Sequence, residues 1–300
     1  MPQGLIVKAL SGYYYVRPDE GGEQLQCRAR GIFRKKGDSP LVGDRVMYSL
    51  TGNGEGSVDE LLPRYSELVR PPVANIDLAL LVFAVVEPEL SRLLLDKFLV
   101  HVEQAGLRTL ICLTKSDLLA KPEYERHSDD IAAVQRDYER VGYPVLLCCA
   151  KTGEGADELL ERLAGHTTVF SGQSGVGKSS LLNRLIPGLQ LETNEISSRL
   201  GRGKHTTRHV ELIAHPAGGY IADTPGFSQL DFDKIEAEEL TSYFIDLAAV
   251  AGGCKFRGCL HRSEPGCAVR EAVAAGRIAQ SRYEHYVLFV EEIKDRKRRY

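Results

Sequence analysis

Two glycines, a lysine and a serine match the spacing G-x-x-x-x-G-K-[ST] over residues 172–179, and a third glycine lies between the two. Glycines so spaced let backbone N–H groups curl around a phosphate, and the N-terminus of a following helix adds positive potential. Lys178 would reach the β- and γ-phosphate oxygens and act in catalysis, and the Ser179 hydroxyl would bind Mg²⁺. The predicted phosphate loop comprises Gly172, Gln173, Ser174, Gly175, Val176, Gly177, Lys178, Ser179 and Ser180.

The flanking segments favour this interpretation over a chance match in a glycine-rich turn. Thr167–Phe170 has the pattern of a strand and Lys178–Leu185 that of a helix, which is the context that the motif requires. A second motif, Asp223-Thr224-Pro225-Gly226, follows the apolar run Tyr220–Ala222. Alone it is usually a turn, but about fifty residues after a phosphate loop it indicates function. Asp223 would hold Mg²⁺, and the Gly226 N–H would meet a γ-phosphate.

Hydrolysis of a nucleotide needs a group that orients the attacking water. In Ras-like enzymes a glutamine after D-x-x-G does so, but here Phe227 stands at that position. Our candidate is His205, within Gly203–Arg208, as a water-positioning group or base. The alternative is a solvated loop histidine with an RNA or structural role. Thr207 is the predicted switch threonine, which would bind Mg²⁺ and sense the γ-phosphate.

Two further segments, each at the end of a predicted strand, could select the base. In Thr114-Lys115-Ser116-Asp117, the Asp117 carboxylate can accept hydrogen bonds from N1–H and the exocyclic amine of guanine. Adenine does not offer that arrangement, so a buried carboxylate discriminates between the bases. The Lys115 stem can lie along the base. In Cys149-Ala150-Lys151, the Ala150 N–H could meet the guanine O6. Separately these are ordinary loops, but together they favour guanine.

Three cysteines and a histidine fall close together near the C-terminus. Their spacing is Cys254-x4-Cys259-x-His261-x5-Cys267. Three thiolates and one imidazole suit four-coordinate structural zinc, with no open position left for catalysis. The alternative, buried cysteines beside a loop histidine, is disfavoured because the surrounding residues are polar. The other four cysteines lie in strand-like runs and are expected to be small buried hydrophobic residues.

The elements that must position these groups change along the chain. Up to about residue 65, short strand-like runs (Gly12–Val16, Leu25–Ala29, Val42–Tyr48) with glycine turns predict a small β-barrel. Arg70-Pro71-Pro72 is predicted to be a linker. Residues 73–230 alternate apolar strands with helices, which predicts an α/β unit with a parallel sheet covered on both faces. The predicted strands are Leu78–Val86, Thr109–Leu113, Val145–Cys149, Thr167–Phe170 and Tyr220–Ala222, and the helices are Arg92–Gln104, Glu123–Val141, Ala156–Ala164 and Lys178–Leu185. Helices are also expected around Glu236–Ala251 and Arg277–Arg299.

Composition excludes several classes of protein. With 300 residues, 38 basic and 41 acidic side chains, and a net charge of −3, the chain is neither a basic nucleic-acid protein nor an acidic disordered one. Its longest apolar run, Leu78–Val86, is too short to span a bilayer. Nucleic-acid contacts would come from local basic patches, Arg28–Lys36, Arg199–Arg208 and Lys294–Arg299, and from stacking by Tyr13, Tyr14 and Tyr15.

The order of the motifs along the chain is unusual and resembles that of a known protein family. The base-selecting segments 114–117 and 149–151 precede the phosphate loop, which is a circular permutation of the usual GTPase order. With a small β domain before and a cysteine-rich domain after it, the chain resembles the ribosome small-subunit-dependent GTPases, the RsgA (YjeQ or YloQ) family. One departure is Thr114, since the general pattern is N-K-x-D and a hydroxyl replaces only part of an amide's hydrogen bonding.

The resemblance implies an N-terminal OB-fold (1–69), a circularly permuted P-loop GTPase domain (70–230) and a C-terminal helical zinc-binding domain (231–300). It implies GTP/GDP, Mg²⁺ and one structural Zn²⁺ as ligands. It also implies hydrolysis of GTP, slow alone and stimulated by the small ribosomal subunit and its rRNA, linked to late maturation or release. We expect a cytoplasmic monomer with no membrane contact. Two alternatives stay open: an RNA-binding scaffold with an inactive nucleotide site, and a P-loop ATPase or kinase.

Overall fold

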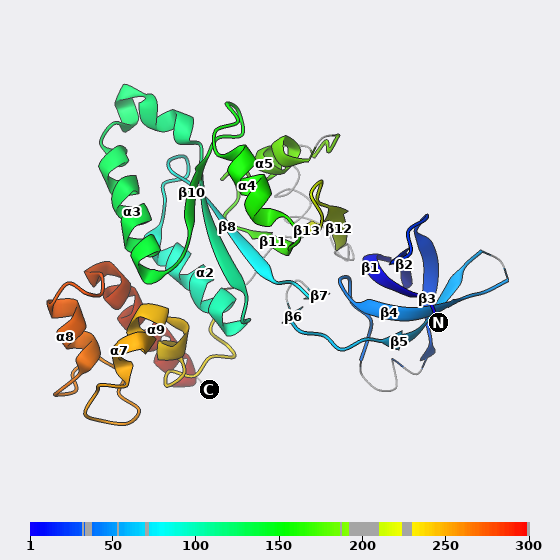
Figure 1. Cartoon of the computed structure of the whole chain (residues 1–300). Helices are drawn as coiled ribbons and strands as arrows, with labels where there is room; N and C mark the ends of the chain where they lie inside the picture. The colour runs from blue at the N-terminus through cyan, green and yellow to red at the C-terminus, as the bar shows by residue number, and fades with distance from the viewer. Residues whose placement is uncertain are drawn as a thin grey trace.

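The computed structural model describes residues 1–31, 33, 38–52, 54–69, 72–186, 188–191, 210–223 and 230–298. These residues form three parts, a β-barrel, a central sheet with helices, and a C-terminal group of helices, with the barrel and the C-terminal helices at opposite ends (Figure 1). Within the described residues, no helix combines the length and apolar character needed to span a membrane.

The N-terminal barrel is closed. Its strands pair in the order β1-β2-β3-β5-β4, and β4 pairs back with β1. Alternate residues point inward, so that Ile6, Val16, Cys27, Val46 and Val58 are fully buried. This is the connectivity of an OB-like barrel. The strands are β1 (Gln3–Leu10), β2 (Tyr13–Pro18), β3 (Leu25–Ala29), β4 (Arg45–Leu50) and β5 (Gly56–Leu61).

The segment after the barrel differs from the predicted linker. A two-stranded antiparallel ribbon joins the barrel to the central unit, formed by β6 (Glu67–Val69) and β7 (Pro72–Ala74). Pro72 therefore begins a strand instead of ending secondary structure. A proline is tolerated there because the first residue of a short edge strand does not need to donate a ladder hydrogen bond.

The central sheet has the predicted parallel arrangement. Its order is β10-β9-β8-β11-β13-β12, in which all neighbours are parallel except the last pair. The strands are β8 (Leu78–Ala84), β9 (Arg108–Thr114), β10 (Val145–Cys148), β11 (Thr167–Ser171), β12 (Glu211–Ala214) and β13 (Tyr220–Asp223). The antiparallel strand β12 was not predicted, because its four residues carry little pattern.

Both faces of this sheet are covered by helices. One face of the sheet shares a buried cluster with α2 (Arg92–Gln104) and α3 (His127–Val141), and the other face shares one with α4 (Ala156–Leu163) and α5 (Lys178–Leu185). Successive β8 residues alternate between the two clusters, which explains the continuous apolar run of this strand. Two short 3-10 helices, η1 (Ser116–Ala120) and η2 (Pro122–Tyr124), follow β9.

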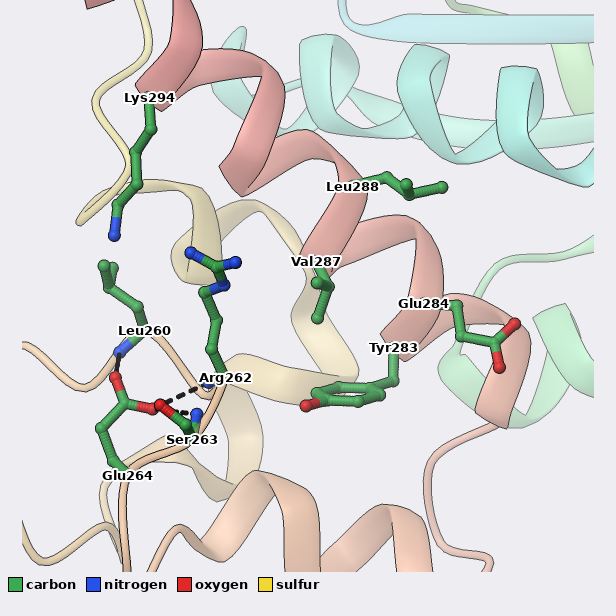
Figure 2. A pocket seen from close by; sticks show the side chains of 9 residues that line it. All are labelled: Leu260, Arg262, Ser263, Glu264, Tyr283, Glu284, Val287, Leu288 and Lys294. Atoms are coloured by element: carbon green, nitrogen blue, oxygen red, sulfur yellow. Dashed lines mark hydrogen bonds between the residues drawn. The ribbon is translucent and has the colours of Figure 1, made fainter.

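The C-terminal part is helical and has its own apolar core. It contains η3 (Leu240–Tyr243), α7 (Ile245–Ala251), α8 (Ala268–Ala274) and α9 (Gln280–Arg298), and Val100 of α2 joins its core. Helix α8 was not predicted. A groove of about 740 Å³ lies between α9 and the loop 260–264 (Figure 2).

Candidate functional site

The parallel strands bring the nucleotide motifs to one edge of the sheet. Strands β9, β10, β11 and β13 end at Thr114, Cys148, Ser171 and Asp223. Because these strands are parallel, their carboxyl ends lie at the same edge, which is where ligands bind in open α/β sheets. The two base-selecting segments, the phosphate loop and the D-x-x-G segment each follow one of these ends.

The predicted phosphate loop lies between β11 and α5. Its first glycine, Gly172, has φ +148°, and an added Cβ would lie 2.0 Å from the Val82 carbonyl oxygen of β8. Only glycine fits this close approach. Gly177 caps α5 with φ +94°, so the helix N-terminus opens toward the loop. Ser179 is buried in the first turn of that helix, and Ser180 follows it.

The lysine of this loop folds back over it. Lys178 Nζ donates to the carbonyl oxygens of Gly172 at 2.7 Å and Gln173 at 2.5 Å. Burial lowers the pKa of Lys178 to about 8, because it removes water from around the charged ammonium group. A buried cation held by loop carbonyls is suited to bind an anion at this position.

Thr114 connects the base-selecting segment to the phosphate loop. Its hydroxyl is buried and lies 2.5 Å from the Val176 carbonyl oxygen and 3.2 Å from that of Phe83. The side chain of Val176 is itself buried among the residues that cover β8. The Thr114 hydroxyl therefore holds the backbone of the phosphate loop in place. An asparagine amide at this position would have more hydrogen-bonding groups than a single hydroxyl.

The remaining base-selecting residues lie together beyond β9 and β10. The buried Cys149 thiol donates to Asp117 Oδ1 at 3.2 Å, and Lys151 Nζ lies 3.9 Å from Asp117 Oδ2. Ala150 lies between these two residues, in the turn that the Gly153 N–H closes on the Cys149 carbonyl at 2.8 Å. The structure thus brings all the predicted base-selecting residues to one place.

Sequence reasoning missed two glutamates that hold this region. Glu154 accepts the Ser116 hydroxyl at 2.7 Å, and the Glu87 carbonyl accepts Lys115 Nζ. Lys115 lies in the left-handed region, with φ 63°. No sequence signal marks Glu87, whereas Glu154 lies three residues after Lys151 and could have been considered with it.

Part of the predicted site lies outside the described residues. His205, Thr207 and Gly226 belong to this part, and for Asp223 only the backbone is described, at the end of β13. Their assigned roles stay predictions.

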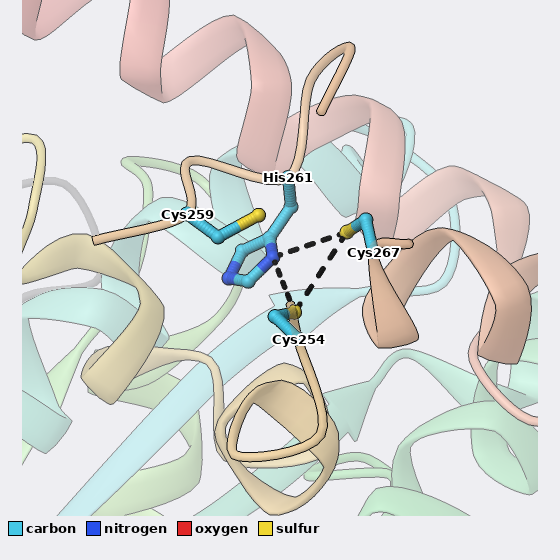
Figure 3. Close-up of side chains that lie close together, drawn as sticks. All are labelled: Cys254, Cys259, His261 and Cys267. Atoms are coloured by element: carbon cyan, nitrogen blue, oxygen red, sulfur yellow. Dashed lines mark hydrogen bonds between the residues drawn. The ribbon is translucent and has the colours of Figure 1, made fainter. Parts of the chain in front are cut away.

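The predicted metal ligands converge in the C-terminal part (Figure 3). The ligand atoms of Cys254, Cys259, His261 and Cys267 all lie within 4.8 Å of one another. Cys254 Sγ is 3.9 Å from Cys267 Sγ, and His261 Nδ1 is 3.5 and 3.3 Å from these two sulfurs. A tetrahedral zinc site requires about 3.8 Å between sulfurs and about 3.5 Å between sulfur and nitrogen. The distances among Cys254, His261 and Cys267 therefore match those of a zinc site, and Cys259 is near enough to be the fourth ligand.

The thiols of the cluster must lose their protons to bind a metal, whereas the imidazole is already in its metal-binding form. Burial, and then the neighbouring thiols, raise the pKa of Cys259 to about 12, so the empty cluster resists forming thiolates. Burial lowers the pKa of His261 and favours the neutral imidazole that binds metals.

A glutamate that the sequence did not reveal organises the metal-binding loop. The Glu264 carboxylate accepts N–H bonds from Leu260 at 2.9 Å, Arg262 at 2.8 Å and Ser263 at 3.0 Å (Figure 2). Burial would raise the pKa of this carboxyl, but the backbone donors outweigh it and lower the pKa to about 2. The loop that presents His261 is therefore held by an ionised side chain.

The barrel carries part of the predicted nucleic-acid surface. Arg28 lies over the Tyr13 ring at 4.6 Å and donates to its hydroxyl, whereas Tyr14 faces the core side opposite Cys27. Of the basic patches, residues 34–36 and 199–208 lie outside the described residues. In the tail patch, Arg296 is engaged within the molecule, since it donates to the Phe232 carbonyl.

Comparison with known sequences decides the family. The family model described as RsgA GTPase matches residues 61–233, and that described as RsgA N-terminal domain matches residues 3–58. The chain belongs to the RsgA GTPase family. Proteins named "Small ribosomal subunit biogenesis GTPase RsgA" share 56% identity in Geobacillus thermodenitrificans and 53% in Bacillus subtilis, over 100% of both chains in each case.

Solved structures agree with membership of the RsgA family. The crystal structure of YloQ, described as a circularly permuted GTPase, is 46% identical with a TM-score of 0.83, covering 99% of this chain and 96% of that one. YjeQ from Thermotoga maritima is 39% identical with a TM-score of 0.86, covering 97% and 98%. The predicted fold class, a permuted GTPase with an N-terminal OB-like barrel, is confirmed. The limits 1–69, 70–230 and 231–300 stay a prediction.

Proposed function

We propose that the protein is a GTPase that binds the small ribosomal subunit and couples GTP hydrolysis to late maturation of the subunit or to its own release. The observation that carries the proposal is the convergence of a phosphate loop and guanine-type loops at one sheet edge, in the permuted order of the RsgA family. The named relatives act in biogenesis of the small subunit, and we extend that role to this chain.

In this proposal the phosphate loop binds the β- and γ-phosphates. The backbone N–H groups of Gly172–Ser180 and the N-terminus of α5 would surround the anion, and Lys178 would exchange its loop carbonyl partners for phosphate oxygens. Mg²⁺ would be held by Ser179, Thr207 and Asp223, and when bound it neutralises charge that develops on the phosphate oxygens. His205 would position the attacking water, because Phe227 has no group that can.

Asp117 would read guanine. Its carboxylate is held from one side by the Cys149 thiol and stays partly exposed, with 24% of the side chain accessible, so that it can accept from a bound base. Substituting Asp117→Asn replaces one acceptor with a donor and should shift preference from guanosine to xanthosine nucleotides. An unchanged guanine preference would refute this assignment of the base site.

Two further features would serve the ribosomal partner. The cluster Cys254, Cys259, His261 and Cys267 would hold one structural Zn²⁺ that fixes the C-terminal loop. The barrel face around Tyr13 and Arg28 would contact rRNA by stacking and phosphate pairing, so that binding weakens steeply as salt rises. We propose that the protein acts as a monomer in the cytoplasm, where ribosomal subunits mature.

The deciding experiment is steady-state GTP hydrolysis with and without purified small ribosomal subunits at fixed moderate salt. Large stimulation by small but not large subunits, absent from Lys178→Ala, is the expected result. His205→Ala then tests the catalytic assignment. GTP binding without turnover in either condition would instead favour the inactive scaffold, and preference for ATP over GTP would favour the ATPase or kinase alternative.

A further inference from the structure

The barrel contacts the central sheet at a defined point. Strand β1 pairs antiparallel with β12, with Lys8 opposite Glu211, which joins the strands of the barrel and of the central unit into one eleven-stranded sheet. At the same position, Lys8 Nζ lies 2.8 Å from Glu211 Oε2. A backbone pairing and an ion pair therefore join the two parts through the same two residues.

The partner strand of this contact is part of the nucleotide site. In the hairpin of β12 and β13, Glu211 is in register with Asp223, the first residue of the D-x-x-G motif. In the sequence, Glu211 also follows the Gly203–Arg208 segment by only three residues. Because hydrogen-bonded strands move together, a displacement of β12 at Glu211 displaces the backbone of Asp223.

A second contact holds the other end of the same hairpin. The Arg17 guanidinium of β2 lies 5.7 Å from the centre of the Tyr220 ring, and Tyr220 is in register with Ala214 of β12. Arg17 and Lys8 thus touch β13 and β12 at opposite ends of the hairpin. This arrangement fixes the orientation of the hairpin against the barrel, where a single contact would leave it free to rotate.

On the barrel, Lys8 lies beside the aromatic and basic face. It is in register with Tyr15, and Leu10, two residues on, is opposite Tyr13, whose ring is covered by Arg28. The register of β1 against β2 shifts between Ile6 and Lys8, a bulge that re-aims the strand just before the contact. Nucleic acid bound on this face would therefore act directly on the strand that carries Lys8.

We propose that Lys8 and Glu211 are positioning residues that couple the barrel to the γ-phosphate side of the nucleotide site. Nucleic acid on the barrel fixes β1, β1 fixes β12, and β12 places Asp223. By thermodynamic reciprocity, GTP at the site then strengthens binding of nucleic acid by the barrel to the same degree. The pair is half-exposed, with 31% and 46% of the two side chains accessible, so it can separate and re-form at small cost. This inference rests on the proposed function.

The test is a charge-reversal cycle with Lys8→Glu, Glu211→Lys and the double variant. The first measurement, on the free protein with Mg²⁺, is the ratio of affinities for a non-hydrolysable GTP analogue and for GDP. Each single variant places like charges together, so we expect the ratio to fall about fivefold, and the double variant to restore it. A purely structural role would lower both affinities equally and leave their ratio unchanged.

The second measurement is the affinity for small subunits with the analogue against that with GDP. The single variants Lys8→Glu and Glu211→Lys should each lower this ratio, and the double variant should restore it. The matched control is Glu292→Lys, which breaks the 2.7 Å ion pair with Lys97 at the other end of the central unit and should alter neither ratio. Unchanged ratios in the singles, or no recovery in the double variant, would overturn the proposal. If wild-type protein does not respond to subunits, the proposed function fails, and the free-protein cycle still decides whether the Lys8–Glu211 contact acts on the nucleotide site.

Discussion

The central GTPase unit contacts its two neighbours in opposite ways. Toward the barrel, the joining ion pair of Lys8 and Glu211 is half-exposed, and the Arg17 contact is a cation lying over a ring. Toward the C-terminal helices, the joining side chains are Arg282 and Asp96, with 2% and 0% of their side chains accessible. The two joining ion pairs therefore differ in their surroundings, since the first lies close to solvent and the second lies in the buried interior.

The buried interface is a fully paired network. Arg282 of α9 binds Asp246 of α7 through two hydrogen bonds of 2.7 Å and donates to Asp96 of α2 at 2.5 Å. Asp96 also accepts from Tyr138 of α3 at 2.9 Å and lies 2.6 Å from His285 Nδ1. Although burial lowers the pKa of Arg282, the two carboxylates outweigh it and raise that pKa above its ordinary value.

The difference in burial between the two ion pairs indicates which of the two contacts opens more easily. A buried charge pair cannot open without leaving unpaired ions in an apolar interior, so we expect the contact between the C-terminal helices and the central unit to persist. An exposed pair exchanges its partner for water at little cost. We therefore expect the ion pair at the barrel to open at lower cost than the ion pair at the C-terminal helices.

Of the substitutions that test this comparison, Arg282→Ala is expected to have the largest effect on stability. It leaves Asp96 and Asp246 buried without their cation, so we expect the free energy of unfolding of the C-terminal helices to fall by about 3–5 kcal/mol. Hydrogen exchange in α7 and α9 measures this loss, with exchange in β1–β5 unchanged.

The matched control is Glu292→Gln, which removes the exposed charge of the ion pair with Lys97 at the same interface and leaves Lys97 over the Phe232 ring. It should cost about 1 kcal/mol or less, because the Glu292 side chain is 48% accessible. Equal losses in the two variants would show that burial does not distinguish the contacts, and the comparison would fail.

Substituting Glu264→Gln tests the loop 260–264, which presents His261 to the metal site in the C-terminal part. The loss of an ionised acceptor for three N–H groups should weaken zinc retention about 10–100-fold, as for other outer-shell partners, in competition with a chelator. The matched control is Glu284→Gln, at an exposed position on α9 near the same groove, which should retain zinc like wild type.

The pH dependence of the Glu264 effect has a fixed sign. The pKa of Glu264 lies at about 2 in the folded protein, below its ordinary value of 4.5, so the carboxylate stabilises the folded loop fully above pH 4.5. That contribution is lost as the pH falls through 2. The melting-temperature difference between wild type and Glu264→Gln should therefore be constant above pH 4.5 and shrink below it. A difference that grows on acidification would contradict this assignment.

The sequence predicted the features that depend on local pattern. The phosphate loop, the strand β8 and the four metal-binding residues each follow from spacing within about twenty residues or fewer, and the structure brings the members of each set together. Helix α2 has the predicted limits because Ser91 accepts the Leu94 N–H and caps it.

The contacts that the sequence did not reveal join residues that are far apart in the chain. Lys8 and Glu211 are 203 residues apart, and Arg282 and Asp96 are 186 apart, so no periodicity links them. Strands β1 and β5 were missed for a related reason. In β1 a bulge interrupts the alternation of buried and exposed residues, since Ile6 and Val7 are both buried, and both strands depend on pairing with β4 across the barrel.

The smallest expected effect on stability is at Arg17, in the interface between the barrel and the central unit. Replacing it with leucine removes the cation over the Tyr220 ring but keeps an apolar side chain there, which should cost about 0.5–1 kcal/mol. Because Arg17 holds the hairpin end opposite Asp223, we expect the affinity ratio of GTP analogue to GDP to change less than in Lys8→Glu. Measuring that ratio in both variants ranks the two contacts. If Arg17→Leu had the larger effect, the hairpin would be oriented from its Tyr220 end, and the ion pair would have only a secondary role in placing Asp223.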